Sequence, residues 1–148
     1  MRSLFGSYRM LLAALVFGLS ITAAPIPAED ELIAAMPWQD VINSQVQAFR
    51  DRDAPTAFGY AGIGFQVTFP NAEVFFEAIL QSGYAPIMES QSHSFGSFKM
   101  IGTAGVIQAV KFVGKDQLRY EAVYQLTEEP GGWRVQGVQL FKAPGIAI

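Results

Sequence analysis

The stretch Gly131–Gly145, GGWRVQGVQLFKAPG, decides the fold because its alternation of apolar and polar residues changes phase. Side chains of a strand alternate between its two faces, so Trp133 and Val135 share one face. The next apolar residues, Val138 and Leu140, fall on the opposite face if the strand is regular. A single regular strand therefore cannot bury all four of these side chains.

One extra residue at Gln136-Gly137 removes this conflict, so the sequence predicts a β-bulge that re-phases and bends the strand. Gly137 is expected to have the positive φ that some bulges require, because glycine adopts it without steric cost. The period of two continues through the second half of the chain and is interrupted only by short turns, which predicts consecutive antiparallel hairpins. The expected strands are Glu89–Met100, Gly105–Val113, Gln117–Glu128 and Trp133–Lys142.

Helical spacing of apolar residues precedes the sheet. A first helix is expected to begin at Pro37 and to end at Arg50–Asp53, and a shorter one to run from Thr56 to about Ala61. Gly59, Gly62 and Gly64 predict a loop or irregular strand over residues 59–69. A third helix is expected after the N-cap Asn71, with Gly83 ending it. Helices followed by a bent antiparallel sheet predict an α+β fold with the helices packed on the concave face of the sheet.

The N-terminus has the layout of a secretory signal peptide. Two arginines precede Met10–Ala24, an uncharged run of 15 residues, and an Ala-rich segment follows it. Cleavage is expected after Ala28, with Ala23 as the second choice; a retained anchor is the alternative, although a membrane span usually needs ~20 apolar residues. The expected organisation is a signal peptide at residues 1–28, a leader at 29–36 and one domain at 37–148. The protein is expected to be periplasmic or secreted and not to associate with the membrane after cleavage.

Charge and composition exclude several classes of function. Removal of residues 1–28 takes away two of the ten Lys and Arg and none of the thirteen Asp and Glu, which leaves a net charge of −5. The remaining cations are scattered, so a nucleic-acid-binding face is excluded. With no Cys and one His, a metal site is not expected. Gly62-x-Gly64 lacks the third glycine of a dinucleotide-binding loop, and no cofactor is expected.

Several segments together resemble a bacterial family of secreted proteins, the domain of unknown function 4864. The likeness covers about residues 38–145, and its segments are Gln45-x-x-Ala48-Phe49-Arg50 with Asp53, Gly83-Tyr84 with Pro86, and Gly132-Trp133-Arg134-Val135-x-Gly137-Val138. Residues 62–68 are richer in glycine and aromatics than that family's pattern, and Phe69-Pro70-Asn71 also departs from it. The resemblance implies export and a cone-shaped fold similar to nuclear transport factor 2, and it supplies no catalytic residue.

A cone of this kind encloses a cavity between the sheet and the helices, and ligand pockets are mostly apolar with a few placed polar groups. The candidate lining residues are Tyr60, Tyr84, His93, Tyr120 and Tyr124, which would suit a small apolar or aromatic ligand. Two alternatives stay open: the tyrosines can be core residues with a hydroxyl at the surface, and His93 can be a surface residue of the first strand.

Two functions are consistent with these features. The first is a non-catalytic module that binds a small ligand or a partner, with a homodimer formed through the convex face of the sheet. The second is a small acid–base enzyme, an isomerase, dehydratase or hydrolase that uses the cavity. No catalytic residue is assigned, because no nucleophile elbow is present and Glu121 is expected to pair with Arg134 across a hairpin. The scarcity of ionisable groups at the expected pocket positions favours the first function.

Overall fold

The structure, a computed structural model, describes residues 36–143. The signal peptide expected at residues 1–28 and all of the leader before residue 36 lie outside the described residues. No helix within residues 36–143 is long and apolar enough to cross a membrane.

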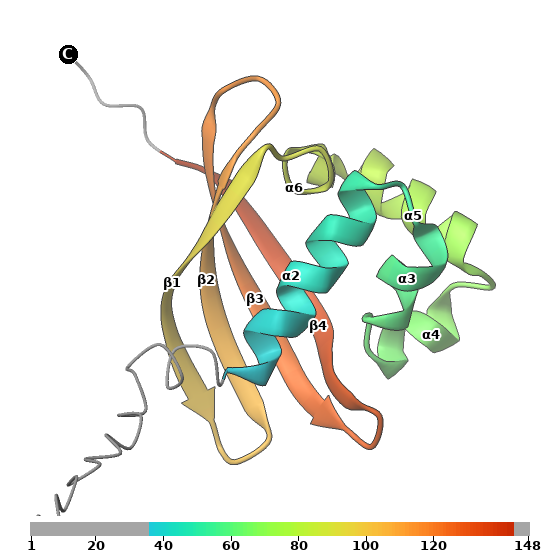
Figure 1. Ribbon diagram of the computed structural model, residues 1–148. Helices are drawn as coiled ribbons and strands as arrows, with labels where there is room; N and C mark the ends of the chain where they lie inside the picture. The colour runs from blue at the N-terminus through green and yellow to red at the C-terminus, as the bar shows by residue number, and fades with distance from the viewer. Residues whose placement is uncertain (1–35, 144–148) are drawn as a thin grey trace, which may run out of the picture.

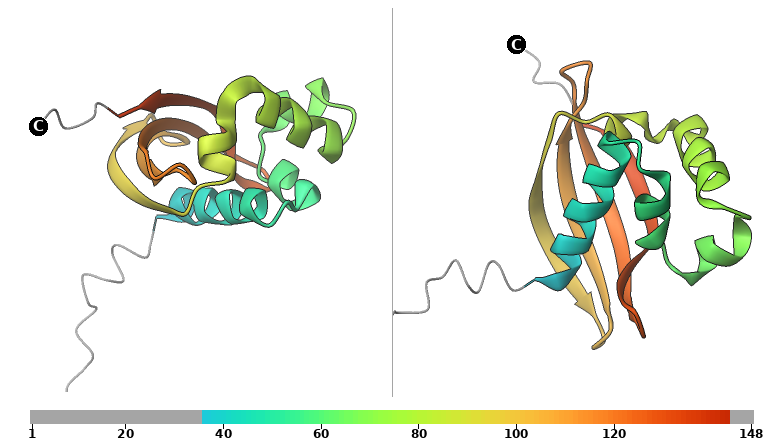
Figure 2. Two further views of the ribbon diagram at one scale, coloured as in Figure 1. Left: turned by 90° about the horizontal axis from the view of Figure 1, so that it is seen from above. Right: turned by 45° about the vertical axis from the view of Figure 1, so that its right-hand side comes forward.

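The second half of the chain forms one antiparallel sheet, as predicted (Figure 1). Each strand pairs with its neighbour in the sequence, so the spatial order is β1-β2-β3-β4. The sheet curves around helix α2 (Pro37–Arg50), which crosses its concave face (Figure 2, left). The α+β fold class and the position of the helices are therefore confirmed. The strands are β1 (Ser92–Ile101), β2 (Gly105–Val113), β3 (Arg119–Glu129) and β4 (Gly132–Lys142).

The predicted bulge in β4 is confirmed, and Gln136 is its extra residue. Gln125 of β3 pairs with Gly137, whereas the next residue of β3, Leu126, pairs with Val135. The apolar side chains on both sides of the bulge consequently face the same core. Trp133 and Val135 are buried in it, and Val138 and Leu140 pack against it.

The expectation for Gly137 is wrong. Positive φ occurs at Gly83, Gly102 and Gly132 among the described glycines, and Gly137 does not have it. A Cβ built on Gly137 would meet no atom within 4 Å. The bulge is made by the register shift at Gln136, so a side chain at residue 137 would cause no backbone strain.

The expected ion pair across the last hairpin is also wrong. Glu121 lies opposite Phe141, whereas Arg134 lies opposite Thr127, several residues farther along β3. The Arg134 guanidinium donates to the carbonyl oxygens of Trp133 and Gly131 at 2.7 and 3.1 Å. The bulge and the hairpin register together separate the two side chains.

A second bulge, not predicted, interrupts β1. Phe95 pairs with Val110 but Phe98 pairs with Gln108, so β1 carries one extra residue between them. The buried Gln108 amide fills the gap by donating to the carbonyl oxygens of Gly96 and Ala109 at 3.0 and 2.8 Å. Its Oε1 accepts from Trp38 Nε1 and from Gln39 Nε2, each at 3.0 Å. One side chain thus fixes both the bulge and the start of α2.

The helices before the sheet follow the predicted order with two exceptions, the short helices α4 (Ile63–Thr68) and α6 (Ala85–Met88), which were not predicted. Residues 62–69, expected as a loop or irregular strand, contain a short helix, α4. The N-cap prediction is confirmed, because Asn71 Oδ1 accepts from Val74 N at 2.9 Å. Gly83 has a φ of 94° and makes the kink at which the third predicted helix ends. The helices are α2 (Pro37–Arg50), α3 (Ala54–Gly59), α4 (Ile63–Thr68), α5 (Ala72–Ile79), η1 (Leu80–Tyr84) and α6 (Ala85–Met88).

Contacts with β4 hold α4 in place. Val135 N donates to Tyr60 O and Gly62 N donates to Val135 O, so the chain before α4 runs beside β4 as a short parallel bridge. Ile63 N, at the start of α4, donates to Glu129 Oε2 at 3.1 Å. The same carboxylate oxygen accepts from Gln136 Nε2 at 2.7 Å. The bulge residue of β4 therefore also takes part in fixing this helix.

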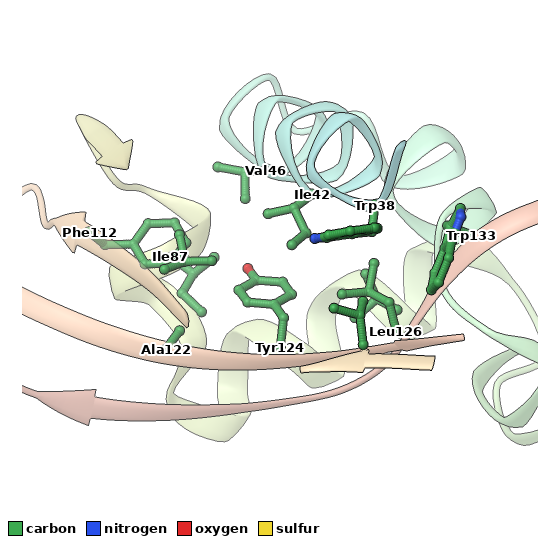
Figure 3. Close-up of a cluster of buried hydrophobic side chains, with 12 residues drawn as sticks. Trp38, Ile42, Val46, Ile87, Phe112, Ala122, Tyr124, Leu126 and Trp133 are labelled. Atoms are coloured by element: carbon green, nitrogen blue, oxygen red, sulfur yellow. The ribbon is translucent and has the colours of Figure 1, made fainter. Parts of the chain in front are cut away.

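The buried side chains form two groups. The first lies between α2 and the sheet (Figure 3), and includes Trp38 and Ile42 of α2 with Tyr124 and Leu126 of β3. The second lies among α2, α3 and α5 and is mainly aromatic, with Phe49, Phe75 and Phe76 at its centre. Tyr84 packs against both groups and marks the place where they meet.

Candidate functional site

A cavity of about 340 Å³ lies where the two groups of buried side chains meet. Aromatic and aliphatic side chains make most of its wall, and the exposed member of the lining is Ser82 of η1. The mouth of the cavity is therefore next to η1, between α5 and the second half of β4. The lining residues are Gln45, Phe49, Ala61, Phe65, Phe75, Ile79, Ser82, Tyr84, Ile87, Met88, Tyr124, Val135 and Val138.

The fold directs these residues to one place by three means. The bulge at Gln136 turns Val138 to the same face as Val135, so both contribute to the wall. The kink at Gly83 turns the chain so that Tyr84 packs against the sheet, where its hydroxyl donates to Val138 O at 2.8 Å. Gln45 lies on the buried face of α2.

Two polar groups of the wall keep an unused hydrogen-bonding atom. Gln45 is 3 % exposed and its Nε2 donates to Ala57 O at 3.1 Å, whereas its Oε1 accepts no hydrogen bond from the described residues. Tyr124 is 1 % exposed, and its hydroxyl has no hydrogen-bond partner within residues 36–143. Burial raises the pKa of Tyr124 well above its usual value, although the nearby Arg50 charge opposes this change. The hydroxyl therefore stays protonated and can donate a hydrogen bond.

Of the candidate residues named from the sequence, the structure places Tyr84 and Tyr124 at the cavity and the other three elsewhere. Tyr60 lies on an open surface groove, with the Arg134 guanidinium 6.0 Å from its ring centre. The Tyr120 hydroxyl donates to Asp116 Oδ2 at 2.6 Å, at the turn between β2 and β3.

His93 also lies outside the cavity, on the outer side of α2, where it joins a chain of polar contacts. Arg50 Nη2 lies 3.0 Å from His93 Nδ1, and Asn43 Oδ1 lies 2.6 Å from His93 Nε2. A guanidinium only donates, so Nδ1 must be the acceptor and Nε2 must carry the proton that Asn43 accepts. Arg50 also donates to Ser90 Oγ at 2.9 Å. His93 is thus held as a neutral imidazole that positions Arg50 against the buried Ser90.

Comparisons with known proteins identify the family of this chain. The family model described as a domain of unknown function, DUF4864, matches residues 32–148. The chain belongs to this family. The structure is similar to a crystal structure of an NTF-2-like protein of unknown function from Silicibacter pomeroyi DSS-3, with 16 % identity and a TM-score of 0.47 over 76 % of this chain and 98 % of that chain. A search of curated proteins gave no match.

The stability of this DUF4864 domain should fall below about pH 6.5 because of His93. Burial, and then the Arg50 charge, lower the pKa of His93 below its ordinary 6.5. At mildly acidic pH the unfolded chain therefore binds a proton that the folded chain does not, so the unfolding free energy is complete above about pH 6.5 and decreases as the pH falls. We expect a change below about 1 kcal/mol, because the imidazole is half exposed and its interactions are screened.

Chemical denaturation between mildly acidic and neutral pH measures this effect, with His93→Gln as the control. His93 is the single histidine of the chain, so the control removes the imidazole titration entirely. The slope of unfolding free energy against pH should be smaller in the variant. Equal slopes for the two proteins would show that His93 has the same pKa in both states.

Gln45 and Ser82 were not among the candidates taken from the sequence of the DUF4864 domain. Gln45 had a usable signal, because it is a polar residue at a position where helical spacing requires an apolar one. Ser82 had none, since its place at the mouth depends on the kink that follows it. Gln108, the most connected polar side chain of the core, likewise looks like an ordinary polar position in its strand.

Proposed function

We propose that this DUF4864 domain is an exported, non-catalytic module that binds a small apolar ligand in the cavity beside η1. The cavity volume of about 340 Å³ carries the proposal, because pockets of ~300–1,000 Å³ with apolar walls and few polar groups are typical of small-molecule sites. Export is inferred from the pattern of residues 1–28.

The chemistry of the wall supports binding rather than acid–base catalysis. The lining residues include no Asp, Glu, His, Lys or Arg. A general acid or base must lie within hydrogen-bonding reach of the reacting group, and its pKa should lie near the working pH. Tyr84 and Tyr124 are the ionisable members of the wall, and the raised pKa of Tyr124 keeps that hydroxyl protonated at neutral pH, so it supplies no base and is a weak acid.

A neutral dye that fluoresces in apolar surroundings, N-phenyl-1-naphthylamine, tests this proposal in titrations of the mature domain. We expect saturable binding to one site. Ser82→Trp should weaken binding by at least about tenfold, because an indole at the exposed residue of the lining obstructs entry to the cavity. Ser82 is exposed, so the change should alter the unfolding free energy by less than about 0.5 kcal/mol.

Gln81→Trp is the matched control. Gln81 is the preceding exposed residue of η1 and does not line the cavity. The Gln81→Trp variant adds the same indole at a neighbouring position, and its affinity for the dye should stay within about twofold of the parent value. Equal affinities of the two variants, or no saturable binding to the parent protein, would contradict the proposal.

A further inference from the structure

The unused hydrogen-bonding atoms of the cavity define the chemistry of its ligand, an argument that rests on the proposed function. The Tyr124 hydroxyl points from β3 toward α2, between the side chains of Val46 and Ile87 (Figure 3). It is a donor without a partner within residues 36–143. Every fully buried side-chain N or O atom within residues 36–143 has a hydrogen-bond partner, so this hydroxyl is accessible from the cavity that Tyr124 lines, and an acceptor supplied there gains a hydrogen bond.

Gln45 provides the complementary atom. Its amide orientation is fixed, because Nε2 must face the carbonyl oxygen of Ala57 to donate to it. Oε1 therefore remains as an acceptor, on the helix toward which the Tyr124 hydroxyl points. Tyr84 adds no second donor, since its hydroxyl proton is used by Val138 O. Tyr124 and Gln45 thus offer one free donor and one free acceptor to the cavity.

Charge on the ligand would be opposed. No charged side chain lines the cavity, and the Nε and Nη2 donors of Arg50, whose charge acts on Tyr124, are directed to Ser90 and His93. An ion that left water for this site would lose its hydration without gaining an ion pair. A neutral group that accepts one hydrogen bond and donates another avoids this loss of hydration and pairs with both free atoms of the wall.

The rest of the wall favours a flat ring. Phe49, Phe65 and Phe75 contribute aromatic faces and edges, and Phe75 packs against the other two with ring centroids 6.2 and 5.8 Å away. Aromatic pairs prefer offset-stacked or edge-to-face geometries, which such a wall offers to a ligand ring.

We propose that the cavity selects a neutral aromatic ligand with one hydroxyl group, which accepts from the Tyr124 hydroxyl and donates to Gln45 Oε1. An aliphatic or charged ligand of similar size binds less well. The ligand is defined here by its chemistry, and an aromatic primary amide would satisfy the same two atoms.

Displacement of N-phenyl-1-naphthylamine by four naphthalene probes tests this selectivity at neutral pH. The probes are naphthalene, 2-naphthol, 2-naphthoate and 2-naphthylmethylammonium. We expect 2-naphthol to bind about tenfold more tightly than naphthalene, as one or two net hydrogen bonds allow, and both ions to bind at least about tenfold more weakly than 2-naphthol.

Tyr124→Phe keeps the ring and removes the hydroxyl, so the preference for 2-naphthol over naphthalene should fall by about fivefold while naphthalene affinity changes little. Tyr120→Phe, which removes a hydroxyl bound to Asp116 outside the cavity, should leave the preference unchanged. If Tyr124→Phe does not fold, the order of the four probes in the parent protein still decides the matter.

The outcomes separate the two proposals. Dye binding that Ser82→Trp weakens, with equal affinities for naphthalene and 2-naphthol, would overturn the hydroxyl selectivity and leave the binding function standing. Tightest binding of 2-naphthoate would also overturn it. Failure of every probe and of the dye to bind would remove both proposals.

Discussion

Deletion of Gln136 should destabilise the domain by only about 1–2 kcal/mol. Without the extra residue, the ladder between β3 and β4 becomes regular, because Val135 and Gly137 then pair with the neighbouring residues Leu126 and Gln125. The four apolar side chains of β4 then occupy alternate positions and stay on the core face. The deletion removes the local bend of β4 and the hydrogen bond from Gln136 to Glu129.

Gln136→Ala is the control for the deletion, because it shortens the side chain and keeps the number of residues. It loses the hydrogen bond to Glu129, which we expect to cost about 1 kcal/mol. Chemical denaturation monitored by the fluorescence of Trp38 and Trp133 measures both variants. A deletion that cost several kcal/mol more than the alanine variant would show that the bend of β4, and not only its phase, is needed to bury its second half.

Gln108→Leu should destabilise the domain by about 2–4 kcal/mol, although it replaces a buried polar side chain with an apolar one of similar size. The leucine leaves the Trp38 indole N–H without its acceptor and the bulge carbonyl of Gly96 without its donor. Buried polar groups that lose a partner cost more than the hydrogen bond itself contributed.

Gln125→Leu provides the comparison for Gln108→Leu. Gln125 is exposed on the other face of the sheet, and no side-chain hydrogen bond of Gln125 occurs within residues 36–143. The unfolding free energy of the Gln125→Leu variant should stay within about 0.5 kcal/mol of the parent value. If thermal unfolding gave the same midpoint for both leucine variants, the Gln108 amide would be dispensable for stability.

The sequence was sufficient to predict the sheet, because the period of two and the phase change at Gln136 both depend on nearest neighbours in the chain. The same pattern could not show which residue is extra. Gly137 was assigned the special backbone because it is a glycine, but it pairs with Gln125 in the regular ladder. In a bulge, two residues of one strand lie opposite one residue of its partner, so the extra residue of β4 is defined by its pairing with β3. The pattern of β4 alone does not contain this pairing.

The helix α4 was missed for a related reason. Gly62, Gly64, Val67 and Thr68 give this segment low intrinsic helix propensity, which favours a loop. Its first amide is nevertheless satisfied by Glu129, 66 residues away in the sequence. Tertiary contacts of this kind override local preference and leave no local signal.

The candidate site was only partly accessible to sequence reasoning. Tyrosines are reasonable guesses for a pocket because they combine a ring with a hydroxyl, yet only Tyr84 and Tyr124 of those named line the cavity. The position of His93 depended on which side of α2 the first strand would meet. That choice is made by the packing of α2 on the sheet, which no spacing in the sequence specifies.

The two bulges also affect how separate molecules meet. β1 and β4 are the edge strands of the sheet, and an edge is a template for strand addition from another molecule. Each edge carries an irregularity, β1 at the bulge between Phe95 and Phe98 and β4 where the chain at Gly62 already occupies it. An incoming strand could therefore match neither edge over its full length.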